Sequence, residues 1–264
     1  MTFVLGLAQC RHPEEGGTEA VLEMAEQWCA EASLRGVDIL VFPESLMTRY
    51  ELDKRSFASE AESIDGPFCC GMDALAARYG LWLVYTGNGR NDEGNPFNTA
   101  VIAGSDGAKH GVYRKVHLFD TDFTKESDRM AAGSALFEPI DTPFGRIGLS
   151  ICYDLRFPEV ARFAATHGCQ LLINPAAWVD GRLKAEQWRT LLSARAIENE
   201  IFVAGLSRVD KGYIGQSAVF GPDGVMLASG SVREELVAAR IGLSAIDGVR
   251  AAMPVLEHRR PELY

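Results

Sequence analysis

Short apolar runs alternate with segments of helical periodicity along the whole chain. Most of these runs are apolar on both sides and end at Gly, Pro, Asn or Asp, a pattern typical of strands buried in a sheet. The predicted strands span residues 1–9, 37–42, 81–86, 98–103, 109–116, 145–151, 169–173, 201–206, 217–220 and 225–228. Gly-containing turns at 104–107 and 221–224 predict that two pairs of these strands form hairpins.

Four segments between the strands repeat their apolar residues with helical spacing. The predicted helices span residues 18–35, 70–79, 158–167 and 184–199. Strands interleaved with helices predict an α/β fold in which helices cover sheets, and the hairpins predict that the sheets are mixed. The polar segment 120–136 predicts a long loop. Because the chain shows no internal repeat and no linker, we expect residues 1–264 to form a single domain.

The net charge and the hydropathy of the chain argue against several classes of partner. The net charge of −10 repels phosphate backbones, so we expect no nucleic-acid partner. No apolar run approaches the roughly 18 residues that a membrane span needs. The first residues also lack the basic region and the cleavage site of a signal peptide. We therefore expect a cytoplasmic protein without a membrane partner.

Six cysteines occur, and their spacing matches no zinc-binding pattern. They are residues 10, 29, 69, 70, 152 and 169. In a cytoplasmic protein we expect reduced thiols, most of them buried as small apolar residues. The sequence contains no phosphate-binding loop either, so we expect neither a metal site nor a cofactor.

Three chemically complementary residues each follow a predicted strand. Glu44 comes after the strand at 37–42, Lys115 lies at the end of a strand-like run, and Cys152 directly follows Ile151. Strand ends are where α/β folds build sites, because side chains and free backbone N–H groups meet there. Taken alone, Cys152 could be a core cysteine, and each charged residue could be a solvated surface group. Their shared position favours a site.

Three motifs around these residues resemble those of the nitrilase superfamily of carbon–nitrogen hydrolases. They are Phe-Pro-Glu at 42–44, Tyr-Arg-Lys-Val-His-Leu-Phe at 113–119 and Ile-Cys-Tyr-Asp-Leu-Arg-Phe-Pro-Glu at 151–159. The resemblance covers nearly the whole chain. It implies a four-layer αββα sandwich with a Glu–Lys–Cys triad, in which Glu44 is the general base, Cys152 the nucleophile and Lys115 the cation that stabilises the tetrahedral intermediate.

The chemistry of these residue types agrees with those implied roles. A thiol is only slightly ionised at neutral pH and needs an adjacent base. A carboxylate is a weak base in water, so we expect a partly dry site that raises the pKa of Glu44. The backbone N–H of Tyr153 can supply a second donor to the oxyanion beside Lys115. Hydrolysis would then run through a thioester, with ammonia leaving first and water attacking second.

Further residues are candidates for the same site. The resemblance implies a second glutamate after the lysine motif, and Glu126 matches it, with the expected role of positioning Lys115; an exposed loop glutamate is the alternative. Ala177 and Trp178 follow a predicted strand end and could line the substrate pocket or simply pack in the core. His117 is expected to be a structural neighbour on the same strand face as Lys115.

The spacing of two local charge pairs favours a structural role over a catalytic one. Arg156 with Glu159, and Arg195 with Glu198, lie at short spacings that favour ion pairs within a helix or turn. We therefore expect neither pair to contact the substrate.

The resemblance is strongest to the amidase branches that act on ω-amides and on deaminated glutathione. These relatives often carry Gly-Pro-Ala-His-Trp before the helix that spans 184–199, whereas this chain has Leu-Lys-Ala-Glu-Gln-Trp at 183–188. The leading hypothesis is hydrolysis of a small acid amide. An N-carbamoyl amide hydrolase or a nitrilase would use the same triad, and a remote alternative is a non-catalytic binding member, which would need a broken triad.

The sequence also predicts assembly into a homodimer or a larger even-numbered oligomer. The resemblance implies pairing through the helix after the nucleophile and the helix at 184–199. Apolar residues of the second helix cover more than one face, and exposed apolar area of that kind marks an interface. The tail at 254–264 is expected to lie across the partner.

Overall fold

Two six-stranded mixed sheets form the centre of the molecule. The computed structural model describes residues 1–48 and 54–263. The first sheet has the strand order β12-β1-β2-β3-β4-β5 and the second has the order β11-β10-β9-β8-β7-β6. In each sheet three parallel strands lie in the middle, β1-β2-β3 and β7-β8-β9, and antiparallel strands flank them.

The strands of the first sheet are β1 (Thr2–Gln9), β2 (Ile39–Val41), β3 (Trp82–Gly89), β4 (Phe97–Ala103), β5 (Lys109–Arg114) and β12 (Glu235–Gly242). Those of the second are β6 (Ile140–Thr142), β7 (Gly145–Leu149), β8 (Leu171–Ala176), β9 (Phe202–Ser207), β10 (Ala218–Phe220) and β11 (Met226–Ser229). The helices are α1 (Gly17–Leu34), α2 (Lys54–Glu60), α3 (Pro67–Tyr79), α4 (Pro158–Thr166), α5 (Lys184–Asn199) and α6 (Ser244–Ala252).

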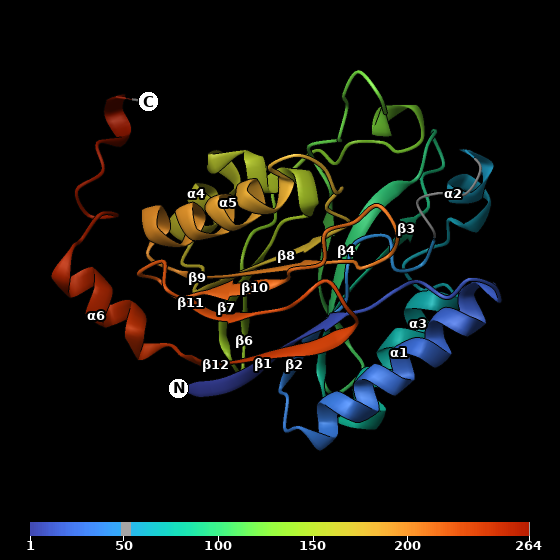
Figure 1. The fold of residues 1–264 in the computed structure, drawn as a ribbon, viewed down its shortest axis with the longest axis horizontal. Coiled ribbons are helices and arrows are strands. Elements are labelled where there is room, and N and C mark those ends of the chain that lie inside the picture. Colours follow the sequence, from blue (N-terminus) through green and yellow to red (C-terminus); the bar gives the residue numbers. More distant parts are fainter. Residues whose placement is uncertain (49–53, 264) are drawn as a thin grey trace.

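Helices cover the outer face of each sheet, so the molecule has four layers (Figure 1). Helices α1 and α3 bury Val21, Ala25 and Met72 against the first sheet. Helices α4 and α5 lie on the outer face of the second sheet, where Trp188 and Leu192 are buried. Between the two sheets, side chains such as Leu5 and Ile173 share one apolar core. The predicted α/β sandwich with mixed sheets is confirmed.

Several predicted strand ends are wrong, and one of these differences affects the position of a site residue. We expected the strand at 169–173 to close at Asn174-Pro175, but β8 continues to Ala176. The neighbouring strand β7 pairs with β8 only as far as Ile173, whereas β9 pairs with β8 to its end. The missing N–H of Pro175 is tolerated because β8 has a partner on one side only at that point. The extension carries the Ala177 N–H beyond the end of β7, to 2.8 Å from Glu44, which follows β2 in the other sheet.

Besides the short 3-10 helices, the sequence-based prediction lacked two α-helices, α2 and α6, and two strands, β6 and β12. β12 carries charged residues at Glu235 and Arg240 along its length, which hides its apolar alternation, yet it pairs with all of β1. Within the described ranges, no helix is both long and apolar enough to cross a membrane.

Candidate active site

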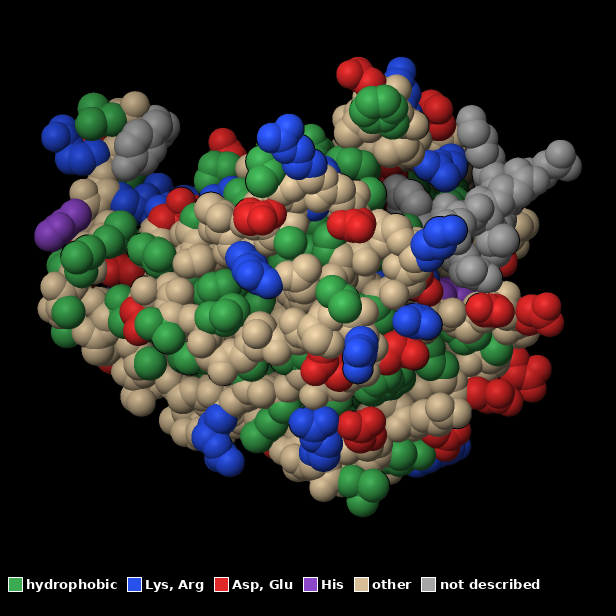
Figure 2. Space-filling model, viewed as in Figure 1, with side chains coloured by type: hydrophobic (Ala, Val, Ile, Leu, Met, Phe, Trp, Pro, Cys, Tyr) green, Lys and Arg blue, Asp and Glu red, His purple; other side chains and the backbone are tan. Residues whose placement is uncertain are grey.

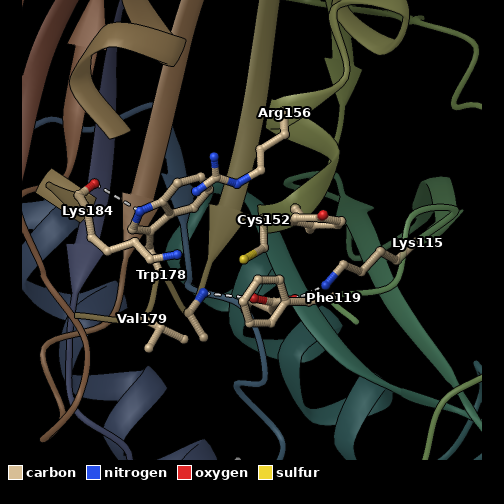
Figure 3. Close-up of a pocket in the computed structure, with 10 residues that line it drawn as sticks. Lys115, Phe119, Cys152, Arg156, Trp178, Val179 and Lys184 are labelled. Atoms are coloured by element: carbon tan, nitrogen blue, oxygen red, sulfur yellow. Dashed lines mark hydrogen bonds and ion pairs between the residues drawn. The ribbon is translucent and has the colours of Figure 1, made fainter. Parts of the chain in front are cut away.

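Cys152 occupies a sharp turn between β7 and α4. It begins a 3-10 helix, Cys152–Arg156, and its φ of +46° is in the left-handed region that residues other than glycine seldom adopt. A backbone hydrogen bond from the Asp154 N–H to the Ile151 carbonyl, at 3.0 Å, closes the turn. Such strain persists only where surrounding contacts fix it, and it is common at functional sites. The turn places the thiol in the pocket (Figure 3).

Glu44 and Lys115 meet beside this thiol. Glu44 lies three residues after β2, and Lys115 directly follows β5. The Lys115 Nζ donates to Glu44 Oε1 at 2.8 Å, and both side chains are almost fully buried. The backbone N–H of Ala177 donates to Glu44 Oε2, also at 2.8 Å. The ends of β2, β5, β7 and β8 thus bring these residues together, as the strand-end pattern predicts.

Glu126 joins the same cluster from the loop after β5. Its Oε2 accepts from Lys115 Nζ at 2.8 Å and from the Phe119 N–H at 2.7 Å. Asn98 on β4 donates to Glu44 Oε1 at 2.8 Å and to Glu126 Oε1 at 3.3 Å. Sequence reasoning missed Asn98, because an asparagine within an apolar strand carries no signal of the side it faces. Two carboxylates therefore hold one ammonium group in a fixed position.

The charges in this cluster set opposite shifts on Glu44 and Cys152. Burial raises the pKa of Glu44, but the charge of Lys115 and hydrogen bonds from Lys115, Cys152 and the Ala177 N–H outweigh it, so the pKa lies below the ordinary 4.5. Burial and the charge of Glu44 raise the pKa of Cys152 well above its usual 9.0, against the opposing effect of Lys115. The resting site therefore holds a thiol beside a carboxylate.

This reverses one expectation. A raised pKa for Glu44 was expected from a dry site, and that direction is wrong, because an ammonium group lies 2.8 Å from the carboxylate. Burial has the largest single effect on this pKa, but the charge of Lys115 and the hydrogen bonds from Lys115, Cys152 and the Ala177 N–H together outweigh it.

A pocket of about 390 Å³, including the space open to solvent, lies over Cys152. Tyr153, Ala177 and Trp178 line it, together with Glu44 and Lys115. Four more lining residues were missed from the sequence: Phe119, Arg156, Val179 and Lys184. Phe119 lies within the lysine motif, and Val179 and Lys184 follow Trp178 closely, so position alone could have suggested them.

Arg156 was placed wrongly from the sequence. Its guanidinium lies 4.8 Å from the centre of the Trp178 ring (Figure 3). It donates to Gln187 Oε1 at 2.9 Å instead of pairing with Glu159. The 3-10 turn rotates Arg156 toward the pocket. The predicted pair between Arg195 and Glu198 is confirmed, at 2.9 Å.

His117 lies beside the site but does not share the environment of Lys115. Because β5 ends at Arg114, the strand-face argument does not apply to either residue. The His117 Nδ1 contacts the Asp154 carboxylate at 2.8 Å, whereas Lys115 points to Glu44 and Glu126.

Among the residues that the structure describes, no group of three or more His, Cys, Asp or Glu side chains is arranged to hold a metal ion. The residues that line the pocket include a thiol, the carboxylate of Glu44 and three cationic side chains, and the carboxylate of Glu126 contacts Lys115 behind them.

Several known proteins are similar to this chain over most of its length. A family model described as carbon-nitrogen hydrolase matches residues 5–251. The omega-amidase NIT2 of Homo sapiens is 34% identical over 89% of this chain and 87% of its own length. The deaminated glutathione amidase of Escherichia coli O157:H7 is 33% identical over 90% of both chains.

Two further relatives extend the comparison. The NitFhit fusion protein of Caenorhabditis elegans is 34% identical over 98% of this chain, which spans only 61% of that protein's length. A crystal structure of a carbon–nitrogen hydrolase from Helicobacter pylori G27 superposes with a TM-score of 0.91 at 28% identity, covering 100% of this chain and 97% of that one.

Proposed function

The chain belongs to the carbon–nitrogen hydrolase family, and from that premise we propose that it hydrolyses a small acid amide to a carboxylic acid and ammonia through a thioester on Cys152. The observation that carries the proposal is the cluster of Cys152, Glu44 and Lys115 at one pocket. The relatives named as amidases support an amide substrate.

The first half-reaction follows from the resting charges. The thiol of Cys152 transfers its proton to Glu44 as the sulfur attacks the amide carbon, since the raised pKa of the thiol disfavours a free thiolate. The ammonium of Lys115 and the backbone N–H of Tyr153 stabilise the oxyanion that forms. Glu44 then gives the proton to the leaving nitrogen, the carbon–nitrogen bond breaks, and ammonia departs from the thioester.

The second half-reaction restores the enzyme. Glu44, again ionised, takes a proton from a water molecule that attacks the thioester carbon. Lys115 stabilises the second oxyanion as it did the first. When the intermediate collapses, the carbon–sulfur bond breaks and the sulfur regains the proton from Glu44. The products are the carboxylic acid and the original thiol.

Two cationic side chains in the pocket support the proposal that the substrate carries an acid group. Arg156 and Lys184 both line it, and among the described residues no carboxylate forms an ion pair with either. Burial and the nearby charge of Arg156 lower the pKa of Lys184. A substrate carboxylate would supply the missing negative charge, while Trp178 and Phe119 contact its apolar chain.

The proposal is tested by measuring ammonia release from ω-amides of dicarboxylic acids, N-carbamoyl amino acids and nitriles at matched chain lengths. We expect the acid amides to be the best substrates. Carbon dioxide released together with ammonia would instead identify a carbamoyl amide hydrolase, and turnover of the nitriles alone would identify a nitrilase.

Replacing Lys184 with methionine should raise KM for an acid amide about tenfold, because one charge-assisted contact of about 1.4 kcal/mol is lost. The same variant should leave KM for the matching neutral amide unchanged. Arg240→Met, which removes an exposed charge on β12 outside the pocket, is the control. Equal effects of Lys184→Met on charged and neutral amides would exclude a role in recognising the acid.

The pH profile distinguishes Glu44 from a histidine as the base. The pKa of Glu44 lies below 4.5, so the carboxylate stays ionised as the pH falls to that value and is protonated only below it. We therefore expect kcat/KM to stay level from neutral pH down to about 5 and to fall below 4.5. An acid limb near 6.5, the ordinary pKa of histidine, would contradict Glu44 as the base.

We also propose that the chain forms a homodimer or a larger even-numbered oligomer through α4 and α5. Trp188, Leu192 and Ala196 of α5 are buried within the subunit, so less of this helix is exposed than the sequence suggested. Ile197 is nevertheless 51% exposed and lies against Gly224, next to the exposed Val225. Figure 2 shows hydrophobic side chains on the part of this face that α5, β11 and α6 occupy.

The tail after α6 extends away from the body of the molecule, as an arm across a partner would (Figure 1). Tyr264, the predicted terminal aromatic, lies outside the described residues.

Light scattering at micromolar concentration should give at least twice the mass of one chain, and Ile197→Asp should lower that mass. Val232→Asp, at another exposed apolar position, is the control. A single-chain mass in the parent protein would contradict the assembly.

A further inference from the structure

Asp154 closes the turn that carries the nucleophile. Its Oδ2 accepts from the Ile151 N–H at 2.9 Å, while its own N–H donates to the Ile151 carbonyl at 3.0 Å. These two hydrogen bonds form a ring around Cys152 and Tyr153. Because Cys152 has a left-handed φ of +46°, the turn needs such a constraint to persist. The Asp154 side chain is completely buried, so water does not compete for it.

The same carboxylate binds the segment that carries Lys115. Asp154 Oδ1 accepts from the His117 backbone N–H at 3.2 Å and contacts His117 Nδ1 at 2.8 Å. Tyr113, on the other side of Lys115, donates its hydroxyl to Asp154 Oδ2 at 2.8 Å. The residues two before and two after Lys115 are therefore both fixed to one carboxylate in the nucleophile turn.

The His117 ring completes this connection. Because a carboxylate only accepts hydrogen bonds, Nδ1 of His117 carries the proton that it donates to Asp154. The ring also stacks on Phe157, with centroids 3.7 Å apart and planes inclined by 10°. Phe157 directly follows the 3-10 helix. His117 thus contacts the nucleophile turn both at Asp154 and just beyond its end.

We propose that Asp154 and His117 are positioning residues, which hold the turn of Cys152 at a fixed separation from the segment of Lys115. The inference rests on the proposed function, because it concerns how the nucleophile and the ammonium group of that reaction are held in place. It assigns no contact with substrate to either residue. Its physical basis is that sulfur and ammonium come from different chain segments, and displacement of a reacting group by about 1 Å can cost roughly 100-fold in rate. The site otherwise relies on Glu44 to link the lysine to the nucleophile.

A matched pair of variants at His117 separates positioning from packing. In His117→Asn the amide nitrogen is bonded to Cγ, as Nδ1 is, so it can still donate to Asp154. In His117→Leu that donor is lost while apolar contact with Phe157 remains. His110→Leu is the control, because His110 also stacks on an aromatic ring, Trp82, and approaches a carboxylate, Asp106, but outside the pocket.

Three quantities should be measured on each variant: kcat for the acid amide, KM for the acid amide, and the rate at which iodoacetamide alkylates Cys152. Peptide mapping should locate the alkylated residue, because Cys70 is exposed and would otherwise contribute to the measured rate. We expect His117→Leu to lower kcat and the alkylation rate about 30-fold each, with KM within about threefold of the parent value. His117→Asn should recover most of both rates, and His110→Leu should match the parent protein.

The result that would overturn the proposal is a His117→Leu variant with the parent's kcat and alkylation rate, or a His117→Asn variant as slow as His117→Leu. Either result leaves the proposed function intact as long as Cys152→Ala is inactive. Activity that survives in Cys152→Ala would instead contradict the proposed function itself, so the two failures are distinguishable.

Discussion

The Cys152→Ala variant should release ammonia from its amide substrate at least about 10⁴-fold more slowly than the parent protein, because removing a covalent nucleophile leaves only binding and oxyanion stabilisation. No other described cysteine lines the pocket with Glu44 and Lys115. The fold should survive, since alanine removes a single sulfur atom and keeps the backbone of the turn. Circular dichroism and an ammonia assay on the same samples measure both effects.

Cys29→Ala is the matched control for this variant. Cys29 is fully buried on α1, and burial raises its pKa to about 12, so its thiol is inert. Its replacement should cost stability of about 1 kcal/mol through a small cavity and leave kcat unchanged. If Cys152→Ala kept its activity while Cys29→Ala lost it, the assignment of the nucleophile would be wrong.

The positions of Glu44, Lys115 and Cys152 could be predicted because each depends on a local pattern, an apolar strand followed by a polar residue. Glu44 and Lys115 follow strands of the first sheet and Cys152 follows a strand of the second. The local pattern therefore placed each residue at a strand end, whereas their meeting across two sheets followed from the family resemblance. Glu126 needed the family resemblance, because nothing in the polar loop at 120–136 distinguishes it from its neighbours. In the structure its side chain is buried together with that of Lys115, 2.8 Å away.

Arg156 and Asn98 could not be predicted, because the direction of each side chain depends on geometry that spacing does not encode. Arg156 and Glu159 have the spacing of an ion pair within one helix. In the structure they lie in different helices, because the 3-10 helix ends at Arg156 and α4 begins at Pro158. Asn98 faces Glu44 and Glu126, and the side of the sheet it faces depends on how β4 is paired with its neighbours. The direction in which the pKa of Glu44 shifts was predicted wrongly for a related reason. The sequence indicates that the carboxylate is buried, but not which charged group lies beside it.

Glu126→Gln should lower kcat by roughly 10² to 10³-fold, an effect comparable to the loss of one oxyanion donor. Both carboxylate oxygens of Glu126 face donors, Lys115 and Phe119 at Oε2 and Lys115 and Asn98 at Oε1. In either orientation the amide nitrogen of glutamine points its own hydrogens at a donor. Lys115 then loses one of the two carboxylate partners that the described residues supply, and its ammonium shifts away from the place where the oxyanion forms.

Two measurements distinguish this positioning effect from general damage. Cys152 should remain open to alkylation in Glu126→Gln, because the thiol, its turn and Glu44 are untouched. Glu200→Gln is the control: Glu200 is equally buried and accepts the Val255 and Leu256 N–H groups at 3.0 and 3.2 Å, outside the pocket. That variant should lose stability but keep kcat, since it breaks buried hydrogen bonds without moving Lys115. A Glu126→Gln enzyme with the parent's kcat would show that Glu44 alone suffices to hold Lys115.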